Sequence, residues 1–212
     1  MSSGFVDTHL HVVNFLQEPM DPQEFDTAMR LAGIDRAVVF GMPVKKKWAT
    51  YEPLRPEYYL DDNAPCYYFS LTDQLVAEFC LALDEPLRAR VAPLVCGFDP
   101  TDRLAIDHLE RVWHRYPFWR GVGELLLRHD DLTNLTVGET GRVDHPALDP
   151  IFDFCAQRGV PVSVHHDVSS PGRPDRYEYV EQLRAMLRRH EGTNTVWCHG
   201  GMSPRVRPSG HI

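Results

Sequence analysis

Short β-branched segments alternate with segments of helical periodicity along the chain, and this alternation constrains the fold more than any other feature. Residues 5–11 and 36–40 have the composition of strands. Between them, Asp21 is placed as an N-cap, Pro22 as a first helical residue and Gly33 as the residue that ends the helix. Strands that alternate with helices imply parallel pairing and right-handed crossovers.

The same alternation continues beyond residue 90. A doubly wound open sheet and a (β/α)8 barrel both fit it, but the nucleotide-binding version of the open sheet is weakened because GxGxxG and GxxxxGK[ST] are absent. Further strands are expected at 91–96, 121–125, 160–165 and 195–199. Further helices are expected from Asp99 through Leu109, Val112 and Trp113, from 146 to 158, and from 174 to 190 with Val180, Leu183 and Leu187 facing inward.

The composition excludes several classes of protein. The chain has 212 residues, which suits one domain, and its net charge of -8 argues against a nucleic-acid or anionic-membrane surface. No apolar run approaches the roughly 20 residues that span a bilayer, and no signal peptide is recognisable. The five cysteines are scattered without CxxC spacing, which predicts buried, reduced thiols in the cytoplasm.

One stretch interrupts the rhythm of strands and helices. Residues 43–66 are polar and rich in proline, and they follow the second predicted strand. In a barrel this insertion would lie on the face where the loops build sites. A solvated excursion is the favoured interpretation, and a substrate lid is the alternative.

The first strand carries two histidines on one side. His9 and His11 are two residues apart, so their side chains share a face with Cα atoms roughly 6.6 Å apart, and both rings can reach one divalent ion. Asp7 shares that face and could orient one of the ligands. An HxH pair at a strand end without any metal is the competing interpretation, and the pair alone is weak evidence.

Two more predicted strands also end in histidine. His165 ends the fifth strand and His199 the sixth, while His166 points to the opposite side and is interpreted as structural or as a residue that supports a ligand. Each could be a hydrogen-bonded core histidine, but a parallel barrel places all such strand ends around one mouth. Glu124, at the end of the fourth strand, is interpreted equally well as a ligand or proton carrier and as a solvated or ion-paired side chain.

Three motifs together resemble the amidohydrolase superfamily. They are Phe-Val-Asp-Thr-His-Leu-His at 5–11, Pro-Val-Ser-Val-His at 161–165 and Val-Trp-Cys-His-Gly-Gly at 196–201. They look closest to the amidohydrolase-related branch, which includes hydrolases, lactonases and nonoxidative decarboxylases. The resemblance covers almost the whole chain and implies a single barrel domain over 1–212.

The resemblance also implies roles for the residues singled out above. His9, His11 and His165 would be the metal ligands, for zinc or alternatively manganese. His199 would lie beside the metal as an acid/base or substrate-polarising group. Glu124 stands where some relatives carry a bridging lysine or glutamate, which leaves a second metal open.

The chain departs from the family pattern at its end. The family places an aspartate ligand at the end of an eighth strand, but Ile212 follows the sixth predicted strand by about a dozen residues, and a complete barrel takes about 250 residues. We therefore expect an incomplete (β/α)8 TIM-type barrel of about six βα units, without strands seven and eight.

The first functional hypothesis is a metal-dependent hydrolase that cleaves an amide, ester or lactone bond of a small molecule through a metal-activated water. A nonoxidative decarboxylase of an aromatic or unsaturated carboxylate is the alternative, and a truncated, non-catalytic fragment is the rival from another class. The expected partner is a small-molecule substrate, with neither nucleic acid nor membrane. Assembly into a homo-oligomer is left open.

Overall fold

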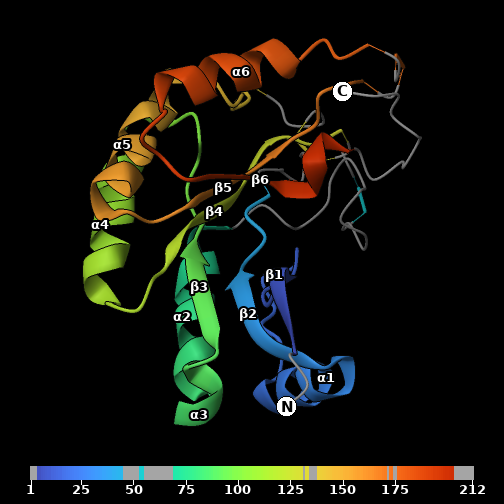
Figure 1. The fold of residues 1–212 in the computed structure, drawn as a ribbon, viewed down its shortest axis with the longest axis vertical. Coiled ribbons are helices and arrows are strands. Elements are labelled where there is room, and N and C mark those ends of the chain that lie inside the picture. The colour runs from blue at the N-terminus through green and yellow to red at the C-terminus, as the bar shows by residue number, and fades with distance from the viewer. Residues whose placement is uncertain are drawn as a thin grey trace.

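A computed structural model describes residues 4–44, 53–54, 69–130, 132–133, 138–170, 172–173 and 176–202. Its six strands are all parallel and follow one another in the order β1-β2-β3-β4-β5-β6, with helices between them (Figure 1). The sheet curls into an incomplete barrel, as predicted. The strands are β1 (Phe5–His11), β2 (Ile34–Phe40), β3 (Val91–Val95), β4 (Gly121–Arg128), β5 (Val162–His166) and β6 (Thr195–Trp197).

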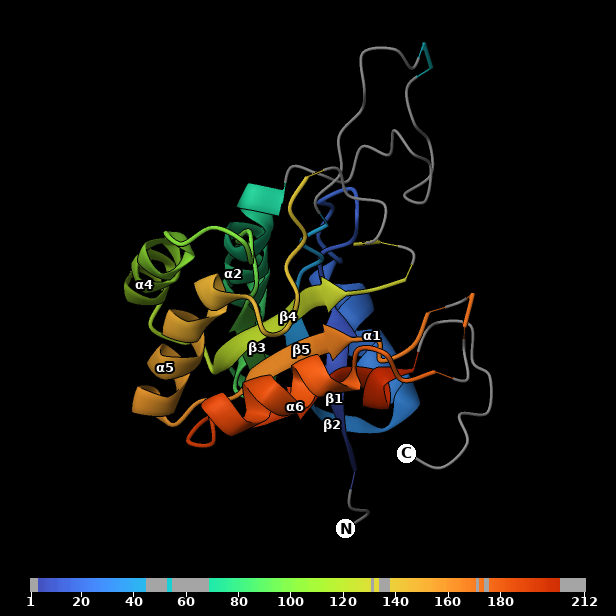
Figure 2. The ribbon, with the colours of Figure 1, turned by 90° about the horizontal axis from the view of Figure 1, so that it is seen from above.

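The longer helices pack on the outer side of the curled sheet, and Figure 2 shows α4, α5 and α6 together on one side of β3, β4 and β5. Strands β4 and β5 are buried along their whole length, as expected for central strands of a parallel sheet. The α-helices are α1 (Pro22–Ala32), α2 (Thr72–Ala82), α3 (Glu85–Arg88), α4 (Ala105–Arg115), α5 (Asp149–Arg158) and α6 (Val180–Arg189), and short 3-10 turns occupy η1 (Phe69–Leu71), η2 (Pro146–Leu148) and η3 (Cys198–Gly201).

Local capping signals place α1 where the sequence predicts it. The Asp21 side chain accepts hydrogen bonds from the backbone N–H groups of Gln23 and Glu24, and Pro22 begins the helix. Gly33 ends it in the left-handed conformation, with φ 67°. The helix buries Phe25 and Met29, whereas Ala28 and Ala32 are exposed.

Two helices begin later than predicted. Asp99 and Asp102 do not start α4, because their side chains accept hydrogen bonds from Thr101 and Leu104 and hold two turns that precede it. Helix α6 begins at Val180 instead of 174. There the backbone at Tyr179 is held by loop contacts, since its N–H donates to the carbonyl of Val168 and its carbonyl accepts from His166. On α6, Leu187 is exposed and Met186 is buried instead.

The last strand is also shorter than predicted. It ends at Trp197, and His199 lies in the η3 turn with φ 55°, a left-handed conformation that is uncommon outside glycine. The insertion predicted at 43–66 falls almost entirely outside the described residues, so it stays a prediction. No helix in the described ranges is long and apolar enough to cross a membrane. Cys80, Cys96, Cys155 and Cys198 are buried free thiols, as predicted for them. Cys66 lies outside the described residues, and the cytoplasmic location stays a prediction.

The main core lies between the sheet and the helices that cover it. Leu109 on α4 is fully buried in this core, which also contains Val95, Val122, Ile151 and Phe152. Trp113 on α4 packs edge-on against Phe154 on α5, with ring centroids 5.3 Å apart. The helices therefore stabilise the sheet chiefly through apolar contact.

Replacing Leu109 with alanine is expected to lower the free energy of unfolding by about 2–5 kcal/mol, because a fully buried leucine leaves a cavity when it is truncated. Denaturant unfolding monitored by circular dichroism measures the loss. Leu104→Ala is the matched control, since this leucine precedes the same helix and is 67% exposed; its effect is expected within about 0.5 kcal/mol. Equal losses in the two variants would contradict the assigned core.

Candidate metal centre

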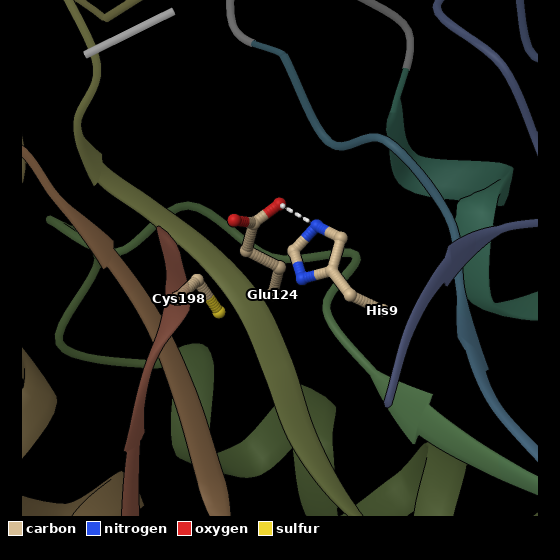
Figure 3. Close-up of side chains that lie close together, drawn as sticks. All are labelled: His9, Glu124 and Cys198. Carbon is tan, nitrogen blue, oxygen red and sulfur yellow. Dashed lines mark ion pairs between the residues drawn. The ribbon is translucent and has the colours of Figure 1, made fainter. Parts of the chain in front are cut away.

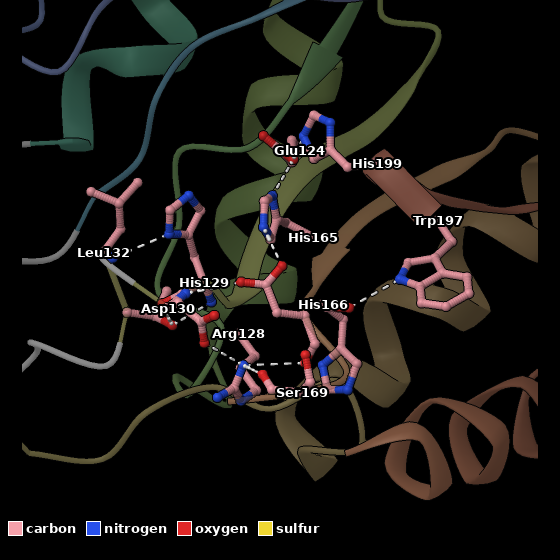
Figure 4. A network of polar contacts seen from close by, with 12 residues as sticks. Glu124, Arg128, His129, Asp130, Leu132, His165, His166, Ser169, Trp197 and His199 are labelled. Atoms are coloured by element: carbon pink, nitrogen blue, oxygen red, sulfur yellow. Dashed lines mark hydrogen bonds and ion pairs between the residues drawn. The ribbon is translucent and has the colours of Figure 1, made fainter. Parts of the chain in front are cut away.

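Four histidines converge on one buried carboxylate, that of Glu124, whose side chain is 2% exposed. Its Oε2 atom lies 3.5 Å from Nε2 of His9 and 3.3 Å from Nε2 of His11. Its Oε1 atom lies 2.9 Å from Nδ1 of His165 and 3.4 Å from Nε2 of His199. Figure 3 shows His9 beside Glu124, and Figure 4 shows His165 and His199 on the same carboxylate.

The parallel sheet explains why residues so far apart in sequence meet. His9 and His11 come from β1, Glu124 from β4, His165 from β5, and His199 from the turn after β6. The carboxyl ends of parallel strands gather at one rim of a barrel, which brings the histidines together. Glu124 was predicted at such an end, but it lies inside β4, which continues to Arg128. The histidine rings also touch one another: the His9 and His199 centroids are 4.5 Å apart, and those of His165 and His199 are 5.0 Å apart.

A buried aromatic ring supports the two histidines of β1. Phe40 at the end of β2 meets the His9 ring edge-on at 4.9 Å and the His11 ring at 4.7 Å between centroids. The Phe40 side chain is fully buried. It gives the site an apolar wall that holds both rings in place. Sequence reasoning did not single out Phe40, although its position at the end of the neighbouring strand was the available signal.

The orientation of His11 suits a metal ligand. Its Nδ1 atom lies 3.0 Å from the carbonyl oxygen of Gly41. Because a carbonyl only accepts, Nδ1 carries a proton, and Nε2, which lies 3.3 Å from Oε2 of Glu124, is the nitrogen that would bind a metal. A backbone carbonyl on the second nitrogen is the usual partner of a metal-ligating histidine.

Glu124 and His165 are both charged although both side chains are buried. Burial alone would raise the pKa of Glu124, but hydrogen bonds from His11, His165, His199 and His9 outweigh burial and hold that pKa well below its usual range. Burial alone would lower the pKa of His165. Its hydrogen bonds to Asp167 and Glu124 outweigh burial and raise that pKa to about 9. Without a metal, His165 is therefore a cation beside an ionised Glu124 at neutral pH.

Cys198 also lies at this centre, next to Glu124 and His9 (Figure 3). Burial and the neighbouring Glu124 carboxylate raise the pKa of its thiol to about 12, so the free thiol is neutral. From the sequence it was interpreted only as a buried thiol. Its position directly before His199 was the signal that could have placed it here.

The donor atoms are compatible with a divalent metal ion. Glu124, His165 and His199 offer ligand atoms that all lie within 4.8 Å of one another, and so do His9, Glu124 and Cys198. Imidazole nitrogen and carboxylate oxygen are ligands that zinc and manganese accept, and a thiolate favours zinc. Glu124 is common to both sets, so it is the centre of the arrangement.

The structure brings together all five residues predicted for the site, namely His9, His11, Glu124, His165 and His199; their individual roles stay predictions. Two supporting residues can be compared with the expectations. Asp7 does not touch a ligand ring, because its Oδ1 atom accepts the backbone N–H of His9 at 2.9 Å. His166 lies on the other side of β5, where its Nε2 atom donates to the Tyr179 carbonyl at 3.0 Å.

No protein-family profile and no curated protein matches the sequence, but the fold matches solved structures. The 5-carboxyvanillate decarboxylase of Sphingomonas paucimobilis has a TM-score of 0.54 and 16% identity, with 94% of this chain and 68% of that chain covered. The 2,6-dihydroxybenzoate decarboxylase of Rhizobium has a TM-score of 0.55 and 15% identity, with coverages of 93% and 67%. A protein described as amidohydrolase II has a TM-score of 0.55 and 12% identity, with coverages of 92% and 67%.

These likenesses confirm the fold that the three sequence motifs predicted. At 12–16% identity they show a shared barrel fold. The chain spans about two thirds of the length of each of these proteins, which agrees with a sheet of six parallel strands.

Proposed function

We propose that this chain forms the metal centre of an amidohydrolase-superfamily enzyme that removes carbon dioxide, without oxidation, from a small aromatic or unsaturated carboxylate. The observation that carries the proposal is the convergence of four histidines on the buried Glu124 carboxylate. Nonoxidative decarboxylation is favoured because two of the structural neighbours, though at low identity, are described as decarboxylases of aromatic acids.

Four residues of the cluster would hold the metal, and the fifth, His199, would transfer a proton. His9, His11, His165 and Glu124 would hold a divalent ion, zinc or alternatively manganese, which would bind the oxygen atoms of the substrate and withdraw charge from them. His199 has the most exposed ring of the cluster, at 42%, so substrate would approach on its side.

His199 is therefore the residue that would supply the proton of the reaction. When the carbon–carbon bond to the carboxylate breaks, carbon dioxide leaves and the electron pair stays on the ring carbon. His199 would donate a proton to that carbon and regain it from solvent, which its exposed ring permits. Phe40 and the buried part of the cluster would keep water away from the remaining ligands.

Hydrolysis of an amide, ester or lactone, the first hypothesis from sequence, is the second candidate. It is favoured by the structural likeness to the protein described as amidohydrolase II. The two reactions differ in their products, so they are separated by assaying the zinc-loaded chain for carbon dioxide release from 2,6-dihydroxybenzoate and for hydrolysis of an activated aryl ester. Carbon dioxide alone supports the proposal, and ester hydrolysis alone favours the second candidate.

The metal centre itself is tested by elemental mass spectrometry of the purified chain. The wild-type chain is expected to hold close to one zinc or manganese ion, and the double variant His9→Ala/His11→Ala is expected to lose the metal and the activity, because two of the converging ligands are gone. His108→Ala/His114→Ala removes two histidines of α4 outside the cluster and is expected to keep the metal. A folded wild-type chain without metal would instead identify a non-catalytic fragment.

A further inference from the structure

A second buried carboxylate lies behind the ring of His165. Asp167 is fully buried, and its Oδ1 atom is 3.1 Å from Nε2 of His165. The other ring nitrogen, Nδ1, is 2.9 Å from Oε1 of Glu124. The imidazole therefore lies between two carboxylates, one inside the candidate metal centre and one outside it.

The side chain of Asp167 is fixed by a donor that cannot change its role. Its Oδ2 atom accepts the backbone N–H of Asp130 at 2.9 Å. A backbone N–H always donates, so this bond requires an oxygen at that position, and Oδ1 is left to face His165. The backbone of Asp167 is also tied to the end of β4, since its N–H donates to the carbonyl of Arg128 at 2.9 Å.

The buried guanidinium of Arg128 links Asp130 to the backbone of the loop that carries Asp167. The Nη1 atom of Arg128 donates to Oδ1 of Asp130 at 2.8 Å, to the carbonyl of Asp167 at 3.2 Å and to the carbonyl of Ser169 at 2.9 Å (Figure 4). The guanidinium also lies 3.8 Å from the centre of the Tyr179 ring. The loop after β5 is thereby fastened to the end of β4, and Asp167 has little freedom to turn away from His165.

We propose that Asp167 is a positioning residue that keeps the proton of His165 on Nε2 and so leaves the Nδ1 lone pair free to bind the metal. This inference rests on the metal centre proposed above. A carboxylate can only accept, so the nitrogen that faces Asp167 must donate. In other metal sites, partners of this kind change metal affinity by about 10–100-fold.

The isosteric variant Asp167→Asn tests the proposal because asparagine has one oxygen instead of two. The backbone N–H of Asp130 would donate to that oxygen, which leaves the amide NH2 group facing Nε2 of His165. The NH2 group donates, which favours the tautomer with the proton on Nδ1, where it opposes metal binding. The zinc affinity, measured by competition with a chromophoric chelator, is expected to fall about 10–100-fold.

A matched control separates positioning from general loss of structure. Asp73→Asn also alters a buried aspartate that accepts backbone N–H groups, those of Cys96 and Gly97, at the end of β3. This control is expected to destabilise the fold and to leave zinc affinity within about twofold of wild type, since it touches none of the four histidines. Thermal unfolding of both variants without metal shows how far each one destabilises the chain.

A spectroscopic readout reports on His165 itself. In the zinc-loaded wild-type chain, labelled with 15N-histidine, the Nε2–H proton of His165 is expected as a downfield resonance that exchanges slowly with water. It is assigned by its absence in His165→Gln, and it is expected to move upfield and exchange faster in Asp167→Asn.

Unchanged zinc affinity and an unchanged resonance in Asp167→Asn would overturn the positioning role while leaving the metal centre intact. Failure of the wild-type chain to bind zinc at all would overturn the metal centre and this inference with it.

Discussion

Replacing Glu124 with glutamine is expected to lower zinc affinity by at least about 100-fold, more than the loss of an outer partner of a ligand would. Its carboxylate belongs to both sets of closely spaced ligand atoms. Glutamine presents no negative charge, and its NH2 group would face a ring nitrogen that has to bind the metal. Competition with a chromophoric chelator measures the affinity.

The same variant is expected to destabilise the metal-free chain by about 1–3 kcal/mol, because a buried cation loses one of its two carboxylate partners and keeps only Asp167. The buried cation here is His165, whose Nδ1 atom lies 2.9 Å from Glu124. Glu139→Gln is the matched control: Glu139 also pairs with a histidine at 2.9 Å, but its side chain is 70% exposed. That control is expected to change neither zinc affinity nor stability appreciably. Wild-type zinc affinity in Glu124→Gln would rule out a central role for this carboxylate.

The sequence predicts the fold well where the determining signals are local. Asp21, Pro22 and Gly33 bound α1 through their own hydrogen bonds and dihedral angles, so neighbours in sequence suffice. Helix α2 was missed because its start has no such signal: Leu71 caps it without a side-chain hydrogen bond. The start of α6 was misplaced because the loop bonds of Tyr179 to Val168 and His166 are tertiary.

The candidate site was predictable in its members and not in its arrangement. His9, His11, His165 and His199 stand near strand ends, and parallel topology brings such ends together. Nothing local marks Glu124 as the residue they share: a glutamate near a predicted strand end is as often solvated, whereas β4 continues to Arg128 and buries Glu124. Asp167 was missed for the same reason: its contact with Asp130 depends on how β4 and β5 align, and their register shifts between Leu126 and Arg128.

The zinc affinity of the chain is expected to rise steeply with pH until about pH 9 and then to level off. The two hydrogen bonds of His165, to Asp167 and Glu124, raise its pKa to about 9 against the opposing effect of burial. Below that pH the metal-free ring carries a proton that zinc must displace, so affinity falls about tenfold for each pH unit. Above that pH no proton remains on the ligand nitrogen, so the zinc affinity no longer depends on pH through His165.

Chelator competition at pH values between about 6 and 9 measures this slope. A histidine with an ordinary pKa near 6.5 would give a plateau above about pH 7.5. A continued rise to pH 9 in the wild-type chain is therefore the result expected from the raised pKa of His165. In Glu124→Gln one of the two bonds that raise this pKa is lost, so the plateau is expected at a lower pH. Flat zinc affinity from pH 7.5 to 9 in the wild-type chain would contradict the buried cation, and with it the electrostatic account of how Glu124 and His165 form one site.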